Sequence, residues 1–85
     1  MDHDLSALKS EIESSLSPTL FSPVLFEEAF AALDERYQQI LTMRYDRKLS
    51  QAEIGYYEGV SYQRIQQLLT YSKRLITEYI EEHLS

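Results

Sequence analysis

The stretch that most constrains the fold runs from Leu49 to Ser61 and contains two helix starts with a turn between them. Ser50 and Glu53 have the spacing of a capping box, in which the serine oxygen accepts a bond from the third helical amide and the glutamate bonds the serine amide. Gly59 supplies the permissive backbone that a helix end needs, and Ser61 is a second N-cap. The stretch therefore predicts a short helix, a three-residue turn and a second helix.

Two helices joined by so short a turn cross steeply, so a small residue is needed where they approach. Gly55 stands there, and we expect a side chain larger than alanine to push the helices apart. Apolar residues fill the four places where such a pair makes contact: Ile54, Val60, Ile65 and Leu68. This spacing is typical of a helix-turn-helix that lays its second helix in a DNA major groove, with a plain helical hairpin as the alternative. Glu58 occupies a place that is normally apolar, so either Tyr57 fills the gap or the turn is unusual.

The charge distribution supports the same half of the chain. A net charge of −6 argues against a generic nucleic-acid binder, which would be strongly basic. The charge is −6 from Met1 to Met43, +3 from Arg44 to Arg74, and −3 in the remaining tail. The positive charge thus coincides with the predicted helix-turn-helix, where a phosphate backbone would be met, unless these are solvated charges on ordinary helices.

Length and composition restrict the number of domains and the class of protein. At 85 residues the chain corresponds to one small domain, and the 44% apolar content with two glycines and two prolines favours a compact helical chain over disorder. No segment is long and apolar enough to span a bilayer. The acidic start lacks a secretory pattern and there is no cysteine, so we expect a cytoplasmic location and no disulfide framework.

The first residues predict an amphipathic helical arm. One apolar stripe recurs at helical spacing: Leu5, Leu8, Ile12 and Leu16. Two prolines between Ser17 and Pro23 then interrupt any helix. We therefore divide the chain into an arm with its linker, residues 1–21, and a helical domain, residues 22–85. The surface that the stripe covers stays open: the rest of the domain, another copy or a different protein.

The remaining segments also read as helices, so the fold class is all-α, with a long C-terminal recognition helix. Ser22 as N-cap and Pro23 start one helix, whose wide apolar face contains Val24, Leu25, Phe26, Ala29, Phe30 and Leu33. Asp34 caps another that reaches about Tyr45, with Tyr37, Ile40, Leu41 and Met43 or Tyr45 inside. The final helix runs from Ser61 to about His83, and its inner face contains Ile65, Leu68, Ser72, Leu75, Ile76, Tyr79 and Ile80.

From about Phe30 to Ile76 the chain resembles region 4 of bacterial sigma factors of the sigma-seventy class. The resemblance rests on Leu33 to Tyr45 (LDERYQQILTMRY), Leu49 to Gly55 (LSQAEIG) and Gly59 to Leu68 (GVSYQRIQQL), a little over half of the chain. The pairs Glu35-Arg36 and Arg44-Tyr45 lie outside the generic helix-turn-helix pattern and make it fairly specific.

The resemblance implies a domain that reads the promoter −35 element and docks on the flap of the RNA polymerase β subunit. It places Tyr62, Gln63, Gln66 and Gln67 at groove-facing positions, with Arg64 and Arg74 at basic ones. With the outward residues of the final helix and two basic residues before the helix-turn-helix, the predicted DNA-binding set is Arg47, Lys48, Ser61, Tyr62, Gln63, Arg64, Gln66, Gln67, Thr70, Lys73 and Arg74.

The chain departs from the family at the reading positions, since Tyr62 and Gln66 replace two arginines and Gln63 replaces a glutamate. Loss of an arginine that bonds guanine removes about 1–3 kcal/mol of discrimination, so the usual −35 preference should be lost. Glutamine prefers adenine, so these residues either read an A/T-rich site or read nothing.

The leading functional hypothesis is a stand-alone sigma region-4-like regulator that binds promoter DNA weakly and gains affinity from RNA polymerase or a companion sigma-like subunit. A chain of this length has no room for the sigma region that melts the −10 element. The alternative is a protein-interaction module, a phage- or plasmid-type modulator of RNA polymerase or of a sigma factor, that has lost DNA reading. A homodimer through the arm or the final helix stays open.

Catalysis is not expected. The two histidines, His3 and His83, lie near opposite ends, and no serine or carboxylate has a partner at a catalytic spacing. Adjacent acids such as Glu81 and Glu82 diverge by about 100° on a helix, which does not suit one metal ion. We therefore expect no enzyme activity, cofactor or metal. Four tyrosines remain as exposed candidates for stacking on bases: Tyr56, Tyr57, Tyr62 and Tyr71.

Overall fold

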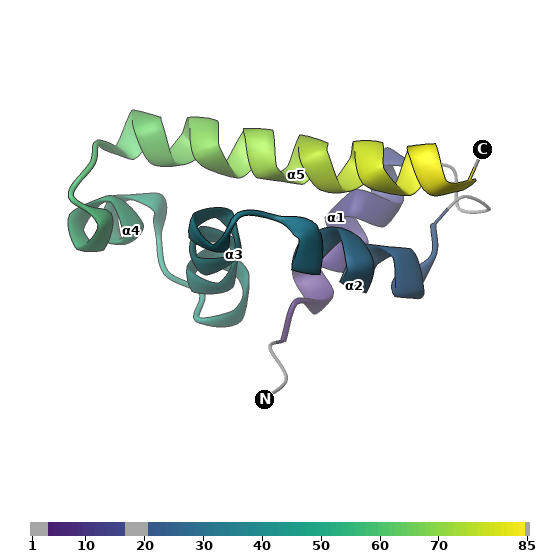
Figure 1. Cartoon of the computed structure of the whole chain (residues 1–85). Coiled ribbons are helices and arrows are strands. Elements are labelled where there is room, and N and C mark those ends of the chain that lie inside the picture. Colours follow the sequence, from purple (N-terminus) through teal and green to yellow (C-terminus); the bar gives the residue numbers. More distant parts are fainter. Residues whose placement is uncertain (1–3, 17–20, 85) are drawn as a thin grey trace.

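A computed structural model describes residues 4–16 and 21–84, and all of its regular structure is helical (Figure 1). The helices are α1 (Ser6–Ser15), α2 (Pro23–Ala32), α3 (Glu35–Leu41), the π-helical turn η1 (Thr42–Asp46), α4 (Gln51–Glu58) and α5 (Tyr62–Leu84). The all-α prediction is confirmed. The predicted linker around Pro18 and the histidine His3 lie outside the described residues.

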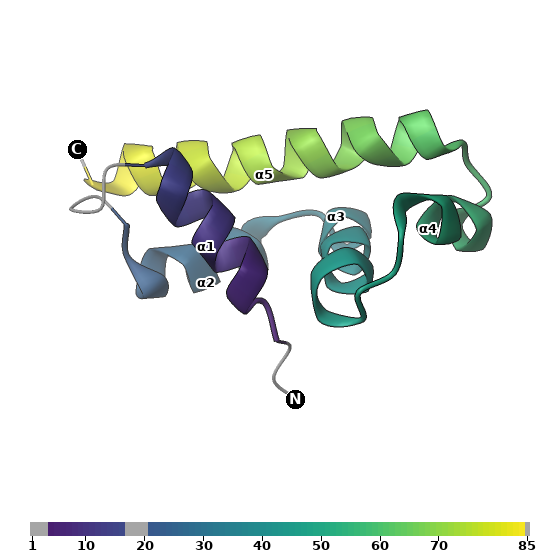
Figure 2. The same cartoon turned by 180° about the vertical axis from the view of Figure 1, so that it is seen from behind.

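Helix α5 is the axis of the molecule. Its 23 residues span about 34 Å, close to the 39 Å longest dimension of the domain. The other helices lie along one side of it, α4 and α3 against its first half and α1 and α2 against its second half, as both views show (Figures 1 and 2). The opposite side of α5 is left uncovered by the described helices over its whole length.

The inner side of α5 lines the hydrophobic core along its whole length. Its predicted inner face is confirmed, with Leu75 and Tyr79 only half-buried and the rest fully buried. Leu69 is also buried, because it lies one turn after Ile65 and two turns before Ile76 on the inner side of the helix. The one buried polar side chain among the described residues, Ser72, donates its hydroxyl to the Leu69 carbonyl at 3.0 Å, so its burial leaves no unpaired donor.

The apolar stripe of α1 lies in this same core. All four of its residues are at most 6% exposed, and Leu8 and Ile12 are essentially inaccessible. Of the three surfaces left open by the sequence, the rest of the domain is the one that covers the stripe. A homodimer through this stripe would therefore require α1 to leave the core. The ion pair of Lys9 with Glu27 of α2, at 3.0 Å, adds a contact at the rim.

Helix α2 begins as predicted, with Pro23 in its first turn and the Ser22 hydroxyl accepting the Leu25 N–H at 3.3 Å. Its apolar face is narrower than predicted. Phe26 is buried, but Val24 is 67% exposed. Side chains two residues apart on a helix point in directions that differ by about 200°, so Val24 and Phe26 cannot both face one core.

The helix-turn-helix forms from the predicted signals. Ser50 Oγ accepts the Glu53 N–H at 3.1 Å, and Glu53 Oε1 accepts the Ser50 N–H at 2.9 Å, which completes the capping box. Gly59 ends α4 in the left-handed conformation with φ of 71°. Ser61 Oγ accepts the Arg64 N–H at 3.1 Å and caps α5. The capping box fixes where α4 begins, Gly59 fixes where it ends, and the Ser61 cap fixes where α5 begins.

The spacing between α4 and the turn is tighter than expected. A Cβ atom on Gly55 would lie 2.7 Å from the Val60 carbonyl oxygen, so even alanine meets the backbone. The expected exclusion of larger side chains therefore extends to alanine, because the close neighbour is the backbone of the turn, which cannot swing aside. Glycine at this position lets the turn fold directly over α4.

The environment of Glu58 differs from both alternatives raised by the sequence. Tyr57 does not fill the gap, being 63% exposed, and the turn begins with Gly59 in the ordinary left-handed conformation. Glu58 instead is half-buried and accepts a bond from Gln39 Nε2 at 3.0 Å. A hydrogen bond to α3 thus takes the place of the apolar contact.

The helix predicted from Asp34 to about Tyr45 is present as α3 and η1. Ile40, Leu41 and Met43 are buried, while the ring of Tyr45 is half-buried. The guanidinium of Arg44 donates to the Leu49 carbonyl at 3.1 Å, which ties η1 to the residue preceding the capping box. Arg44 therefore helps to orient the helix-turn-helix against α3.

Candidate nucleic-acid interface

The first half of α5 presents an uncovered polar surface, which we call the glutamine face: Gln63, Gln66, Gln67, Thr70, Tyr71 and Arg74. These six exposed residues line one shallow groove along the outer side of the helix. Among the described residues, the hydrogen bond recorded for these side chains is the local one from Arg64 Nη1 to Gln67 Oε1, at 3.4 Å. Their amides are therefore available for a partner.

Five of the eleven residues predicted to bind DNA line this surface: Gln63, Gln66, Gln67, Thr70 and Arg74. Ser61 lies at the helix start as the cap of α5, and Tyr62 beside it is 51% exposed. Tyr71, predicted only as an exposed tyrosine, joins the groove while its ring packs edge-on against Tyr37 with centroids 5.7 Å apart. The structure thus adds an anchored aromatic ring to the glutamine face.

Lys73 is held elsewhere. Its Nζ donates to the Tyr45 hydroxyl at 3.1 Å and lies 3.8 Å from Glu11 Oε2. The Tyr45 hydroxyl in turn donates to Glu11, and burial together with this bond raises the pKa of Tyr45 above its ordinary value. We call these three residues the Lys73 cluster. It joins α1, η1 and α5, and it turns Lys73 away from the groove that the glutamine face lines.

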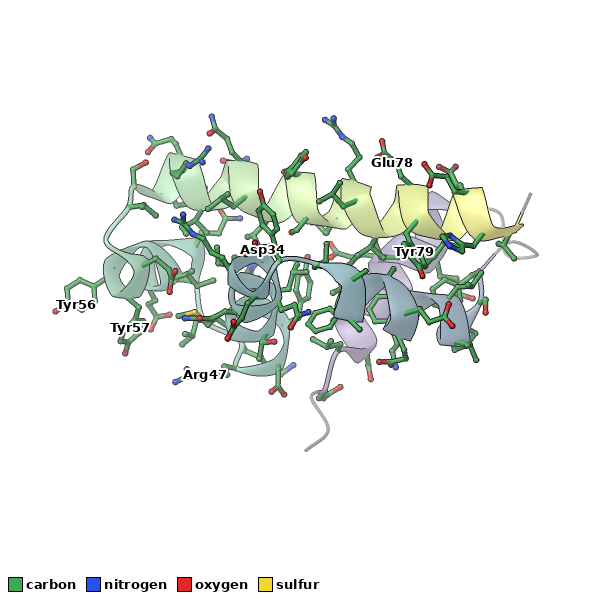
Figure 3. The ribbon with its side chains drawn as sticks, in the orientation of Figure 1. Asp34, Arg47, Tyr56, Tyr57, Glu78 and Tyr79 are labelled. Atoms are coloured by element: carbon green, nitrogen blue, oxygen red, sulfur yellow. The ribbon has the colours of Figure 1, made fainter. Side chains whose placement is uncertain are left out.

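Arg47 and Lys48 are not brought to the glutamine face either. Arg47 projects from the side of α3 that is turned away from α5 (Figure 3). Lys48 adopts a left-handed backbone with φ of 60°. Hydrogen bonds with Ser6 and, to a smaller extent, the charge of Lys48 lower the pKa of Asp4, which lies just before α1. Two of the predicted contacts therefore belong to a different surface of the molecule.

That second surface contains a groove between α3 and α4, which sequence reasoning missed. Its lining residues come from α2, α3, η1 with the residue after it, and α4: Phe30; Glu35, Gln38 and Gln39; Thr42, Met43 and Arg47; Tyr57 and Glu58. Tyr57 and its neighbour Tyr56, which is 84% exposed, project from α4 on this side of the molecule, away from α5 (Figure 3). The exposed tyrosines were the only sequence signal that pointed to it.

Comparison with known families decides what this arrangement is. The family model described as "Sigma-70, region 4" matches residues 29–74, more than half of the chain. The chain belongs to the sigma-70 region 4 family. Membership makes its helix-turn-helix a DNA-binding element used in transcription, and the family is one of regulatory domains, not of enzymes. Searches of curated proteins and of solved structures find no significant match.

The C-terminal limit of the region 4 match coincides with the end of the glutamine face. The matched segment contains α3, α4 and the glutamine face, and it ends at Arg74, the last residue of that face. The α1 helix and the acidic second half of α5 lie outside it. The part of this chain shared with the family is thus the part that presents an uncovered, non-acidic helix face.

Two further observations concern other kinds of site. Within residues 4–16 and 21–84, no group of three or more His, Cys, Asp or Glu side chains is placed to hold a metal ion. In the same ranges, no helix combines the length and the hydropathy that crossing a membrane requires.

Proposed function

We propose that this protein is a stand-alone sigma region-4-like transcription regulator that binds promoter DNA through the glutamine face and also docks on RNA polymerase. One observation carries the proposal: the outer side of the second helix of a region 4 helix-turn-helix is exposed and makes no bonds to the rest of the described chain. In a helix-turn-helix, residues near the start of this helix contact base edges in the major groove.

The charge of the surface supports weak binding by the protein alone. Residues 62–74 contain three basic side chains and no acidic one, but Lys73 is engaged with Glu11 and Tyr45. Arg64 and Arg74 are then the exposed cations of this segment. Because phosphate contacts supply most of the non-specific affinity for DNA, two arginines alone favour a binder that needs a second anchor.

RNA polymerase, through its β-subunit flap, or a companion sigma-like subunit would supply that anchor. The groove between α3 and α4 is the surface best suited to it, since it is lined by the half-buried ring of Phe30 and the exposed ring of Tyr57. It faces away from α5 (Figure 3), so a protein docked there would leave the glutamine face open to a duplex. Both partners could then be bound at once.

Gel shifts with promoter DNA, with and without bacterial RNA polymerase, test the proposal. We expect a weak shift with the protein alone, at low salt, and a stronger one when polymerase is present. Tyr57→Ala should remove the gain from polymerase and leave the weak shift, whereas Arg74→Ala should weaken the shift under both conditions. A protein that binds neither promoter DNA nor polymerase would remove the proposal.

The net charge of −6 favours a second candidate, a protein-interaction module that modulates RNA polymerase or a sigma factor and no longer reads DNA. Salt dependence separates the two. A protein that neutralises two to four phosphates should lose DNA affinity with a log-log slope of about −2 to −4. Binding to polymerase with a flat DNA response at all salt concentrations would favour the interaction module.

A further inference from the structure

From the geometry of the glutamine face we infer that it reads adenine in A·T base pairs, with Gln63 and Gln67 as the specificity-determining residues. The inference rests on the proposed DNA-binding function and names the class of site that it recognises. Both side chains are exposed and lie one turn apart on the outer side of α5, near the end of the helix that a major groove receives.

The chemistry of a side-chain amide selects adenine. Its carbonyl oxygen accepts from the adenine N6 amino group while its NH₂ donates to N7, and both bonds lie in one plane. Guanine presents two acceptors at the same places, so the glutamine carbonyl would face O6 without a hydrogen between them. A buried, unpaired carbonyl is costly, which makes the choice between the two purines sharp.

The spacing of the two glutamines sets the spacing of the bases. Four residues advance an α-helix by about 6 Å, and one base-pair step is about 3.4 Å. Gln63 and Gln67 should therefore contact bases about two steps apart. Thr70, one further turn along, lies where its methyl group can meet the methyl group of a thymine.

Neighbouring residues orient these amides and limit the length of the site. Arg64 donates to Gln67 Oε1 at 3.4 Å, which positions the carbonyl and leaves its second lone pair and both amide hydrogens for adenine. Arg74 ends the face about 16 Å from Gln63 along the helix, roughly five base-pair steps. Glu78 then projects outward from α5 (Figure 3), and its charge repels phosphate, so the site read by one domain is short.

Selection from a pool of duplexes with a randomised centre, using the full chain at low salt, tests the inference. We expect enrichment of adenine at two positions about two steps apart, with a preference over guanine of roughly 5- to 150-fold at each. Gln63→Ala and Gln67→Ala should each remove the preference at one position. Gln67→Arg should replace adenine by guanine there, a gain that a misfolded variant cannot produce.

The control is Glu81→Ala, an exposed position on the same helix in the acidic half, which should leave the selected sequence unchanged. Retention of duplexes with no base preference, or with a preference that neither glutamine variant alters, would overturn the inference and leave DNA binding standing. Failure to retain any duplex, even after RNA polymerase is added, would overturn both the inference and the proposed function.

Discussion

The two halves of α5 share one buried inner face, but their outer faces carry opposite net charges. The first half, residues 62–74, has a net charge of +3 and exposes the glutamine face, whereas residues 75–85 carry −3 from Glu78, Glu81 and Glu82. The buried side changes little along the way, because Ile65, Leu68, Ile76 and Ile80 all enter the same core. The charge of the outer face therefore changes along the length of α5, while the character of the buried face does not.

The difference shows how a small domain with a net charge of −6 can still present a surface free of acidic side chains, as the proposed DNA contact requires. The second half of α5 packs against α2 and α1, whose apolar stripe extends the core beyond the segment matched by the family. The first half is supported mainly by α4 and α3, which leaves its outer side open. The core thus lines the whole length of α5, whereas the glutamine face occupies its first half only.

The largest expected effect comes from removing the support of the second half. Ile12→Ala on α1 deletes a buried side chain, which should lower the free energy of unfolding by about 2–5 kcal/mol. Ser14→Ala, on the exposed side of the same helix, is the matched control and should change it little. Chemical denaturation measures both. Equal stabilities of Ile12→Ala and the wild type would mean that residues 1–21 behave as an arm separate from the domain of residues 22–85.

A smaller effect is expected from a substitution in α4, the helix that positions the first half of α5. Gly55→Ala brings a Cβ atom within 2.7 Å of the Val60 carbonyl oxygen, an overpacking that typically costs about 1–3 kcal/mol. Alanine recovers about 1 kcal/mol of helix propensity, so the net loss should be about 0–2 kcal/mol. Thermal or chemical unfolding gives the number. A more stable Gly55→Ala variant would show that α4 and the turn are not in close contact.

The Lys73 cluster lies at the junction of the halves and makes stability depend on alkaline pH. The pKa of Tyr45 is raised in the folded state, so the folded protein holds this proton more tightly than the unfolded chain does. Its stabilising effect is complete below about pH 10, the ordinary tyrosine value, and is lost as pH rises further. Tyr45→Phe should show a shallower decline in unfolding free energy above that pH. Identical alkaline slopes would contradict the arrangement.

The smallest change sharpens the contrast in charge. Glu78→Lys extends the positive half of α5 by one turn, and it should steepen the salt dependence of DNA binding by about one unit of log-log slope. Glu28→Lys makes the same substitution at an exposed position on α2, away from α5, and is the control. Fluorescence anisotropy with a labelled duplex measures both slopes. An equal increase in the two variants would mean that net charge alone governs binding.

Local signals account for the parts of the fold that were predicted correctly. The capping box of Ser50 and Glu53, the left-handed Gly59 and the cap of Ser61 each involve residues within a few positions of one another. Such bonds depend on sequence spacing alone, and so do the inner faces of the helices. The glutamine face follows from the same periodicity, since whatever lies opposite a buried stripe is exposed.

The features that were missed depend on residues far apart in the chain. Lys73 is paired with Glu11, 62 positions away in the sequence, and no local pattern predicts that pairing. The exclusion of alanine at Gly55 depends on where one carbonyl of the turn points. The groove between α3 and α4 likewise combines segments whose relative placement follows from packing and not from spacing.

The most direct test of the account is an NMR titration of the protein with duplex DNA, followed through backbone amides and glutamine side-chain NH₂ groups. The account predicts that signals of residues 61–74, above all the side chains of Gln63 and Gln67, shift on binding, while those of residues 75–84 and of α1 stay in place. Shifts concentrated in the second half of α5 or in α1, with Gln63 and Gln67 unchanged, would contradict it.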